Sequence, residues 1–242
     1  THGLMSGENL VPLAPSYDTP GFFTRDLPTM AAIASVFQKD QTPEGPVTFW
    51  LPSDLWSLVD DGVAGALRAS CPAGECRLDP LLPGGDLTDW LHVFRIHQGY
   101  EIWQALGPWI EQHQPDFGPG IRERFDTASK ISKQEFDSAV ERRSAIRSHL
   151  ETSIAPTTIL VFPTSPGVAP LRTTPQEDLD VFRNAALTLL CVAGHAGLPQ
   201  ISVPLAIYDG APIGLSLLGA RGTDLRLIAA AQTFAPVSLA HT

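Results

Sequence analysis

Serine side chains are the first candidates for nucleophilic chemistry in this sequence. Ser6 stands directly before Gly7, and Ser165 lies in the run Pro-Thr-Ser-Pro-Gly. A serine attacks a carbonyl only when a base takes its proton, and many hydrolases hold such a serine in G-x-S-x-G, which is absent here. A Ser–His–Asp set built from either serine and one of the seven histidines stays open on composition. No spacing in the sequence supports it.

Lysine can also serve as the base, and the sequence has three lysines: Lys39, Lys130 and Lys133. We expect Lys39 in a polar turn and the other two between helices in a charged segment. None stands at the end of an apolar strand, where loss of water would lower the pKa of the ammonium. We therefore predict no catalytic residue in this chain.

Histidine and cysteine patterns do not indicate a metal site. His92 and His97 are five residues apart and share a helix face poorly, and three cysteines at these spacings fit neither zinc nor a disulfide framework. We place His195 in a loop before a strand, where it either contacts a substrate or is satisfied locally. No P-loop or G-x-G-x-x-G is present, so we expect no cofactor and no metal.

Composition narrows the class of protein. The 242 residues are 43% hydrophobic and 17% charged, which predicts a folded chain with a substantial core. The formal net charge of −10 disfavours nucleic acid as a partner. No apolar run is long enough to span a membrane and no secretory signal is recognisable, so we expect a cytoplasmic protein. Cys71 and Cys76 are free thiols or one local bridge, and Cys191 is a core residue.

The elements that must position these residues alternate between helices and strands. We predict a turn-rich start with brief strands over 1–24, a strand over 47–52, a buried strand in 157–163, and a final hairpin whose turn is Asp209-Gly210. Predicted helices cover 27–37, 53–69, 86–109, 120–128, 132–154, 182–193 and 223–234.

Local signals define several of these boundaries. Asp26 can cap the first helix, and Ser132 with Glu135 fits a capping box. Gly107-Pro108 is expected to break or kink the helix that contains it, and Phe117-Gly-Pro-Gly is expected to form a turn. In the long charged helix the inward residues are predicted to be Phe136, Val140, Ile146 and Leu150.

Four segments in order resemble amidase signature enzymes. They are PLAPSYDTPGFFTRDL from Pro12, VFRIHQGYEIWQALGPWIEQHQPDFGPGIRERF from Val93, TTILVFPTSPGVAP from Thr157, and GLPQISVPLAIYDGAPIGLSLLGARGTDLRLIAAA from Gly197. The last contains G-L-P-x-x-S-x-P followed by D-G-x-P-x-G, and the second contains an E-x-W helix. Each motif alone is moderately specific, and together they cover most of the chain in order.

The resemblance implies an α/β fold with a mixed β-sheet flanked by helices. It also implies carboxamide hydrolysis by a Ser–Ser–Lys triad, with backbone N–H groups stabilising the oxyanion. This chain lacks the Gly/Ser-rich loop that carries the two serines in the family. Its first residues resemble the stretch just after that loop. We therefore expect 1–242 to be a single incomplete amidase-like domain, with the N-terminal part of the fold missing.

The resemblance places the substrate-binding residues near the start of the chain. Asp18, Thr19 and Gly21 are expected to wall the acyl pocket, and Asp18 alternatively caps a turn before Pro20. Phe22, with the phenylalanine after it, lines that pocket or belongs to the core. The loop 164–170, at a strand end, is a second and weaker pocket candidate.

The expected function is that of the C-terminal part of an amidase, inactive as this chain stands. Its full-length form would act on a small-molecule amide. The alternative is a non-catalytic amidase-like binding or pairing module. Exposed strand edges of an incomplete sheet would favour a homo-oligomer, and neither a membrane nor a nucleic acid is expected as a partner.

Overall fold

The computed structural model describes residues 1–38, 45–71, 76–118 and 120–234. Lys39 and Pro119, each part of a predicted turn, lie outside the described residues. The strands are β1 (Thr48–Trp50), β2 (Thr158–Pro163), β3 (Gln200–Tyr208) and β4 (Ala211–Leu218). The helices are α1 (Leu27–Phe37), α2 (Ser53–Trp56), α3 (Asp61–Arg68), α4 (Leu87–His113), α5 (Ile121–Ser129), α6 (Lys133–Ser153), α7 (Gln176–Ala196) and α8 (Asp224–Ala231).

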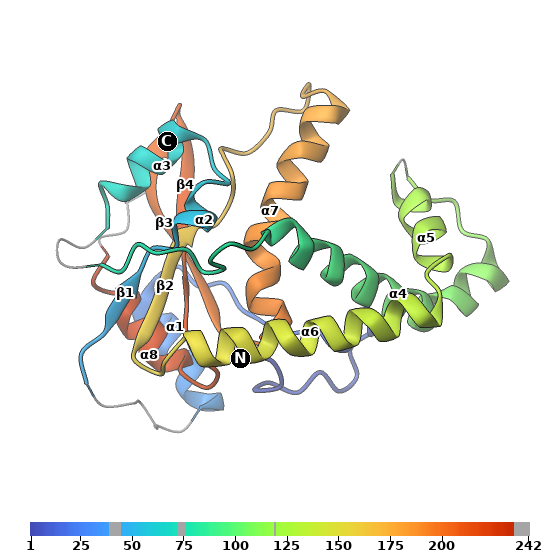
Figure 1. Cartoon of the computed structure of the whole chain (residues 1–242), viewed down its shortest axis with the longest axis horizontal. Coiled ribbons are helices and arrows are strands. Elements are labelled where there is room, and N and C mark those ends of the chain that lie inside the picture. The colour runs from blue at the N-terminus through green and yellow to red at the C-terminus, as the bar shows by residue number, and fades with distance from the viewer. Residues whose placement is uncertain (39–44, 72–75, 119, 235–242) are drawn as a thin grey trace.

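The four strands form one mixed sheet in the order β1-β2-β4-β3 (Figure 1). β1 is parallel to β2, while β4 is antiparallel to both β2 and β3. Every residue of β2 is buried, which confirms the prediction of a strand covered on both faces. The indole N–H of Trp56 donates to the carbonyl of Val161 at 2.9 Å and so fixes α2 against β2.

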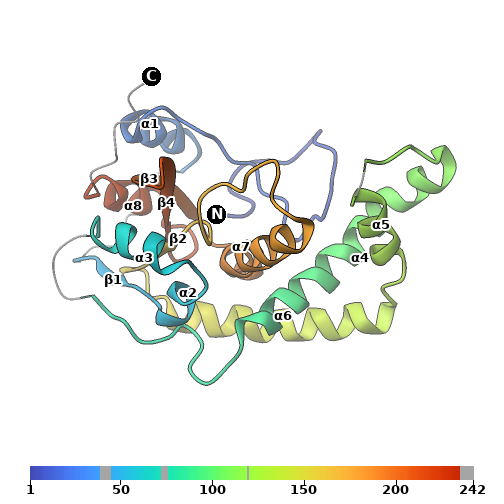
Figure 2. The ribbon, with the colours of Figure 1, turned by 90° about the horizontal axis from the view of Figure 1, so that it is seen from above.

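Helices surround this sheet in two groups. α3 and α8 both pack against the β3–β4 hairpin, and α1 lies against α8. The long helices α4, α6 and α7 contact one another and form a helical layer beside the sheet (Figure 2). The far end of α4, together with α5, projects away from the sheet (Figure 1). The predicted α/β architecture with a mixed, helix-flanked sheet is confirmed.

Several local signals act as predicted. The Asp26 side chain accepts from the Thr29 amide at the start of α1, and both halves of the Ser132–Glu135 capping box are formed. Asp209 and Gly210 have positive φ values of 49° and 72°, as a tight hairpin turn requires. Cys191 is buried, and all three cysteines are free thiols.

Other predictions were wrong. Residues 1–24 form turns and loops without the predicted strands. The helix predicted over 53–69 is two helices, because the Asp60 side chain accepts from the Gly62 and Val63 amides and starts α3 anew. α4 does not end at Gly107-Pro108; it continues through Pro108 to His113. A proline inside a helix removes one backbone hydrogen bond and crowds the preceding turn, and α4 accommodates both without ending.

Boundary and burial errors also have physical reasons. α7 begins at Gln176 rather than 182, with Glu177 and Asp178 in the first turn where the helix dipole favours acids. α8 ends at Ala231, earlier than predicted. Val140 is exposed, while the adjacent Ala139 is buried. Along β3, Ile201, Val203 and Leu205 are buried, and the alternation ends at the register shift between Pro204 and Ala206, after which Ile207 is exposed.

Within the described ranges, no helix combines the length and apolar character needed to cross a membrane.

Candidate functional site

A cavity of about 710 Å³ lies between the N-terminal segment, the helices α1, α7 and α8, and the strand β3. Most of the side chains that line it are apolar. They come from the N-terminal segment (Leu4, Met5, Pro20, Phe22, Phe23), α1 (Met30, Ala34, Phe37), α7 (Leu190, Ala193) and α8 with β3 (Leu227, Ile228, Ile201). Such a lining suits a ligand with an apolar body.

The cavity borders the outer edge of β3. Ile201 and Ser202 both line it, and successive residues of a strand face opposite sides of the sheet. β3 is the last strand of the described sheet and pairs there only with β4. The cavity therefore meets both faces of the hairpin at a sheet edge, close to the end of β2, where Thr164 also lines it.

Three of the four residues predicted from the resemblance reach this cavity. Thr19, Gly21 and Phe22 line it, and Asp18 does not. The Asp18 carboxylate accepts from the amides of Leu13 at 2.9 Å and Ala14 at 3.1 Å, so it holds a turn. The Asp18 carboxylate therefore holds a local turn, while the other three residues line the cavity.

Phe23 and the loop 164–170 were the other predicted pocket residues, and they reach the cavity only in part. Phe23 is fully exposed and lines the cavity, which excludes the core alternative for this residue. In the loop 164–170 only Thr164 lines the cavity. The hydroxyl of the next residue, Ser165, instead donates to the Gly167 carbonyl at 2.8 Å.

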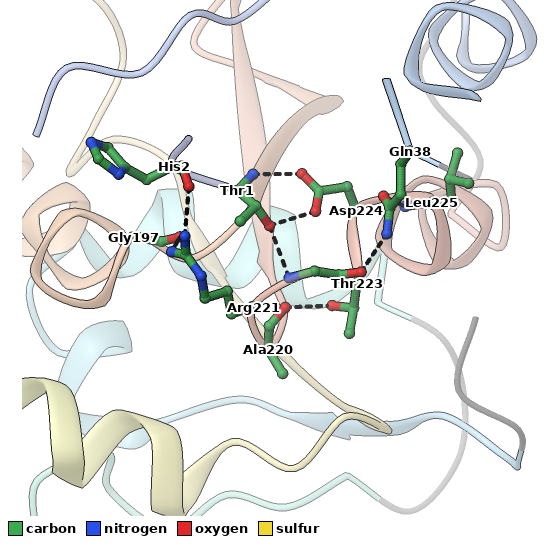
Figure 3. A network of polar contacts seen from close by, with 10 residues as sticks. Thr1, His2, Gln38, Gly197, Ala220, Arg221, Thr223, Asp224 and Leu225 are labelled. Carbon is green, nitrogen blue, oxygen red and sulfur yellow. Dashed lines mark hydrogen bonds and ion pairs between the residues drawn. The ribbon is translucent and has the colours of Figure 1, made fainter. Parts of the chain in front are cut away.

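A polar network fixes the first residues to the cavity wall (Figure 3). The Thr1 hydroxyl donates to Asp224 at 2.5 Å and accepts from the Gly222 amide at 2.9 Å. The Thr1 amine is also 2.5 Å from the Asp224 carboxylate. Arg221 donates to the carbonyls of His2 at 2.8 Å and Gly197 at 3.2 Å. Asp224, the one acid among the described residues that line the cavity, is therefore already engaged.

A partly buried cluster of polar side chains joins four parts of the fold. Arg143 on α6 donates to the carbonyls of Ser16 at 2.8 Å, Gly194 at 3.1 Å and His195 at 3.2 Å. Glu101 on α4 accepts from the Ser16 amide at 3.0 Å and from its hydroxyl at 2.5 Å. Arg143 and Glu101 thus hold the segment around Ser16 between α4, α6 and α7.

Tyr17 connects this cluster to the cavity, which it also lines. Its ring lies edge-on to those of Phe94, His97 and His195, with centroid separations of 5.0, 5.3 and 6.3 Å. Burial raises the pKa of the Tyr17 phenol well above its ordinary value. The tyrosine is therefore neutral at physiological pH and acts as a packing residue of the wall.

The two histidines of the cluster are buried and neutral. Burial lowers the pKa of His195 to about 4, and the nearby Arg143 charge lowers it further. Burial, followed by the charge of Arg143, also lowers the pKa of His97. Nε2 of His195 lies 3.0 Å from the Trp90 carbonyl, which assigns the proton to that nitrogen.

His195 is thus not the loop residue that the sequence suggested. It lies in the last turn of α7 and is 1% exposed. Arg143 and Tyr17 were not predicted as members of this cluster. The one signal for this cluster was the E-x-W motif of the resemblance, whose Glu101 holds Ser16.

Neither described lysine approaches the cavity. Lys130 follows the end of α5 and Lys133 begins α6. Both are exposed. Within the parts of the chain that the structure describes, His, Cys, Asp and Glu residues form no group of three or more that could hold a metal ion.

Comparison with known proteins identifies the fold. The sequence pattern of the Amidase family matches residues 98–228. The chain is 27% identical over 270 residues to Amidase 1 of Arabidopsis thaliana, covering 97% of this chain and 64% of that protein. It is 23% identical over 267 residues to the chloroplastic Outer envelope protein 64 of Arabidopsis thaliana, covering 98% of this chain and 45% of that protein.

A solved structure described as a crystal structure of amidase has the same fold. It matches with a TM-score of 0.81 at 23% identity, over 96% of this chain and 57% of that one. The chain spans less than two thirds of the length of these relatives. Since the family pattern covers more than half of its 242 residues, the chain belongs to the Amidase family.

Proposed function

We propose that this chain is the C-terminal portion of an amidase that hydrolyses the C–N bond of a small-molecule carboxamide. Family membership and the largely apolar cavity beside Thr19, Gly21 and Phe22 support the proposal. In it these three residues contact the acyl part of the substrate, and the whole of 1–242 acts as one incomplete domain. The triad and the oxyanion loop belong to a segment that this sequence does not contain.

The proposal includes the inactivity of this chain alone. The observation that carries it is the composition of the cavity wall. Among the described residues that line the cavity there is no lysine, and its serine, Ser202, is hydrogen-bonded to another hydroxyl rather than to a base. A Ser–Ser–Lys mechanism needs an amine next to its hydroxyl pair to remove the serine proton.

Incubation of the purified chain with acetamide, benzamide and an indole-type amide tests this inactivity. We expect no ammonia release above that of a heat-denatured sample. Turnover that a serine-directed fluorophosphonate abolishes would show that a nucleophile is present and would overturn the inactive assignment. Joining the coding sequence upstream of Thr1 should restore activity if it encodes a lysine and a Gly/Ser-rich loop.

A non-catalytic binding or pairing module is the second candidate. The observation that favours it is the outer edge of β3, which has no partner strand among the described residues. Exposed strand edges associate readily, so an incomplete domain is expected to form a homo-oligomer, whereas an autonomous module should stay monomeric. A monomer in size-exclusion chromatography with one sharp unfolding transition would support an autonomous module. An oligomeric or non-cooperative species would support an incomplete domain.

A cytoplasmic location is also part of the proposal, and it rests on the sequence alone. The relative named for the chloroplast outer envelope makes cell fractionation the appropriate test. Recovery of the protein with a membrane fraction would contradict this part of the proposal.

A further inference from the structure

Four polar side chains form a chain of hydrogen bonds across the strand ends beside the cavity. Gln200 Nε2 donates to Ser216 Oγ at 2.7 Å, Ser216 Oγ is 3.0 Å from Thr164 Oγ1, and Thr164 Oγ1 is 2.9 Å from Ser202 Oγ. Ser202 is directly opposite Ser216 in the β3–β4 register. Thr164 follows β2, so this chain of hydrogen bonds joins the neighbouring strands β2, β4 and β3.

Burial gives this chain of hydroxyls a direction. Ser216 is 0% exposed, and its oxygen already accepts from Gln200. Its own hydrogen must be donated, because a buried donor without a partner costs about 1–3 kcal/mol. Among its described partners the acceptor is Thr164 Oγ1. Thr164 in turn donates to Ser202. The hydroxyl hydrogen of Ser202 is then not used within this chain of hydrogen bonds and points away from Thr164.

Ser202 is exposed and lines the cavity, so its hydrogen is available to a ligand there. Successive hydroxyls that donate in one direction polarise each other and strengthen the last donor. Among the described residues that line the cavity, Asp224 is engaged by Thr1, and there is no arginine or lysine. The described part of the site therefore offers the Ser202 hydroxyl as a hydrogen-bond donor in an apolar surrounding, with no arginine or lysine for an anionic ligand.

We propose that Ser202 donates a hydrogen bond to the carbonyl oxygen of a neutral, largely apolar ligand bound in the cavity. Thr164 and Ser216 act as positioning residues that orient the Ser202 hydroxyl. The proposal deepens the proposed function, on which it rests for the class of ligand, by naming a polar contact inside the same cavity. The oxygen that Ser202 contacts need not be that of the scissile bond.

Two probes with the same carbon skeleton, which differ in one carbonyl oxygen, test this contact. Acetophenone has a carbonyl oxygen and no amide bond, and ethylbenzene replaces that oxygen by hydrogens. Dissociation constants are measured by NMR titration of the purified chain and of Ser202→Ala. One hydrogen bond contributes about 0.5–1.5 kcal/mol, so Ser202→Ala should weaken acetophenone binding about 3- to 10-fold. The affinity for ethylbenzene should stay unchanged.

The control and relay variants separate the contact from general packing. Ser165→Ala removes the hydroxyl next to Thr164 that does not face the cavity, and it should leave both affinities unchanged. Ser216→Ala retains Ser202 but interrupts the chain of hydrogen bonds. It should therefore weaken the binding of acetophenone by about 2- to 3-fold and leave the binding of ethylbenzene unchanged. Thermal unfolding of each variant shows that the comparison is made between folded proteins.

Two outcomes would overturn the inference. One is that acetophenone does not bind the wild-type chain, and the other is that Ser202→Ala changes both affinities equally or neither. Because acetophenone cannot be hydrolysed as an amide, these results are independent of amidase activity. Amide turnover restored by an upstream segment would leave the proposed function standing even when the Ser202 contact fails.

Discussion

The guanidinium of Arg143 lies 4.0 Å from the centre of the Tyr17 ring and also donates to the carbonyl of the residue before it, Ser16. This pairing connects α6 with a wall residue of the cavity. Stacking of a desolvated guanidinium on an aromatic ring contributes about 2 kcal/mol in favourable cases. Arg143 therefore fixes the N-terminal segment against the helical layer.

Removal of this side chain should be strongly destabilising. Arg143→Ala deprives three carbonyls and the Tyr17 ring of their partner, so the free energy of unfolding should fall by about 2–4 kcal/mol. Arg142→Ala is the matched control, because Arg142 forms an exposed pair with Asp89 and should contribute less than about 1 kcal/mol. Urea denaturation of both variants measures the difference. Equal losses would show that the Arg143 cluster does not hold the segment.

Retention of the charge alone should not restore the contacts of Arg143. Arg143→Lys supplies a compact ammonium that cannot serve three carbonyls and also stack on Tyr17. We expect its loss of stability to be about half that of the alanine variant. Hydrogen exchange at the amides of 14–19 should increase in the order wild type, lysine, alanine. Exchange in α5, which lies away from the cluster, should be the same in all three.

His195 should make stability depend on pH in the acidic range. Its pKa is lowered from 6.5 to about 4 on folding, so between these values the unfolded chain binds more protons than the native chain. The stability that His195 contributes is present above pH 6.5 and is lost as the pH falls toward 4. The loss approaches about 1.4 kcal/mol per pH unit within that window.

Replacement by a side chain that does not titrate tests this dependence. His195→Gln retains an N–H for the Trp90 carbonyl and should flatten the curve of unfolding free energy against pH between 4 and 6.5. His113→Gln is the control, since His113 is exposed at the end of α4 and should leave the curve unchanged. An unaltered slope in His195→Gln would assign the acid sensitivity to other groups, of which His97 is the first to examine.

Local signals were sufficient for much of the fold. Asp26, the Ser132–Glu135 box and Asp209-Gly210 act through neighbours within a few residues, so the sequence displays both partners at once. The cluster around Arg143 joins positions from 16 to 195, and no local pattern brings these together. His195 was misplaced because the glycines around it suggested a loop. Gly197, with a φ of 64°, instead ends α7, and the helix continues through His195.

The cavity was only partly accessible from the sequence. The family resemblance pointed to Thr19, Gly21 and Phe22, but α1 and α8 reach the same cavity from opposite ends of the chain. The direction of the hydroxyl chain depends on the burial of Ser216, which the register of β3 and β4 determines. Neither the contribution of α1 and α8 to the cavity nor the burial of Ser216 can be derived from spacing along one strand.

Gly194 and Gly65 should respond oppositely to alanine. A Cβ on Gly194 would lie 3.1 Å from Cδ1 of Tyr17, whose ring is held by Arg143, Phe94 and His97 and cannot move away. Gly194→Ala should therefore destabilise the fold by about 1 kcal/mol or more. Gly65 in α3 has no atom within 4 Å of such a Cβ, so Gly65→Ala should stabilise by about 0.5–1 kcal/mol. Two stabilising results in thermal denaturation would show that the wall at Tyr17 can adjust.

Asp18 and Thr19 provide the last contrast, between a turn residue and a wall residue. Asp18→Ala removes the acceptor of the Leu13 and Ala14 amides, so the free energy of unfolding should fall by about 1–2 kcal/mol. Asp18→Asn retains one carbonyl oxygen and should lose about half as much. Both variants should bind acetophenone within about twofold of wild type, because Asp18 does not line the cavity.

Thr19→Val should show the reverse pattern. Thr19 lines the cavity and its hydroxyl makes only a long bond of 3.3 Å to the Tyr17 carbonyl, so the stability should change by less than about 0.5 kcal/mol. The affinity for acetophenone should change instead, since the cavity gains a methyl group and loses a hydroxyl. If Asp18→Asn alters the affinity more than Thr19→Val does, Asp18 contacts the ligand and its turn role is secondary.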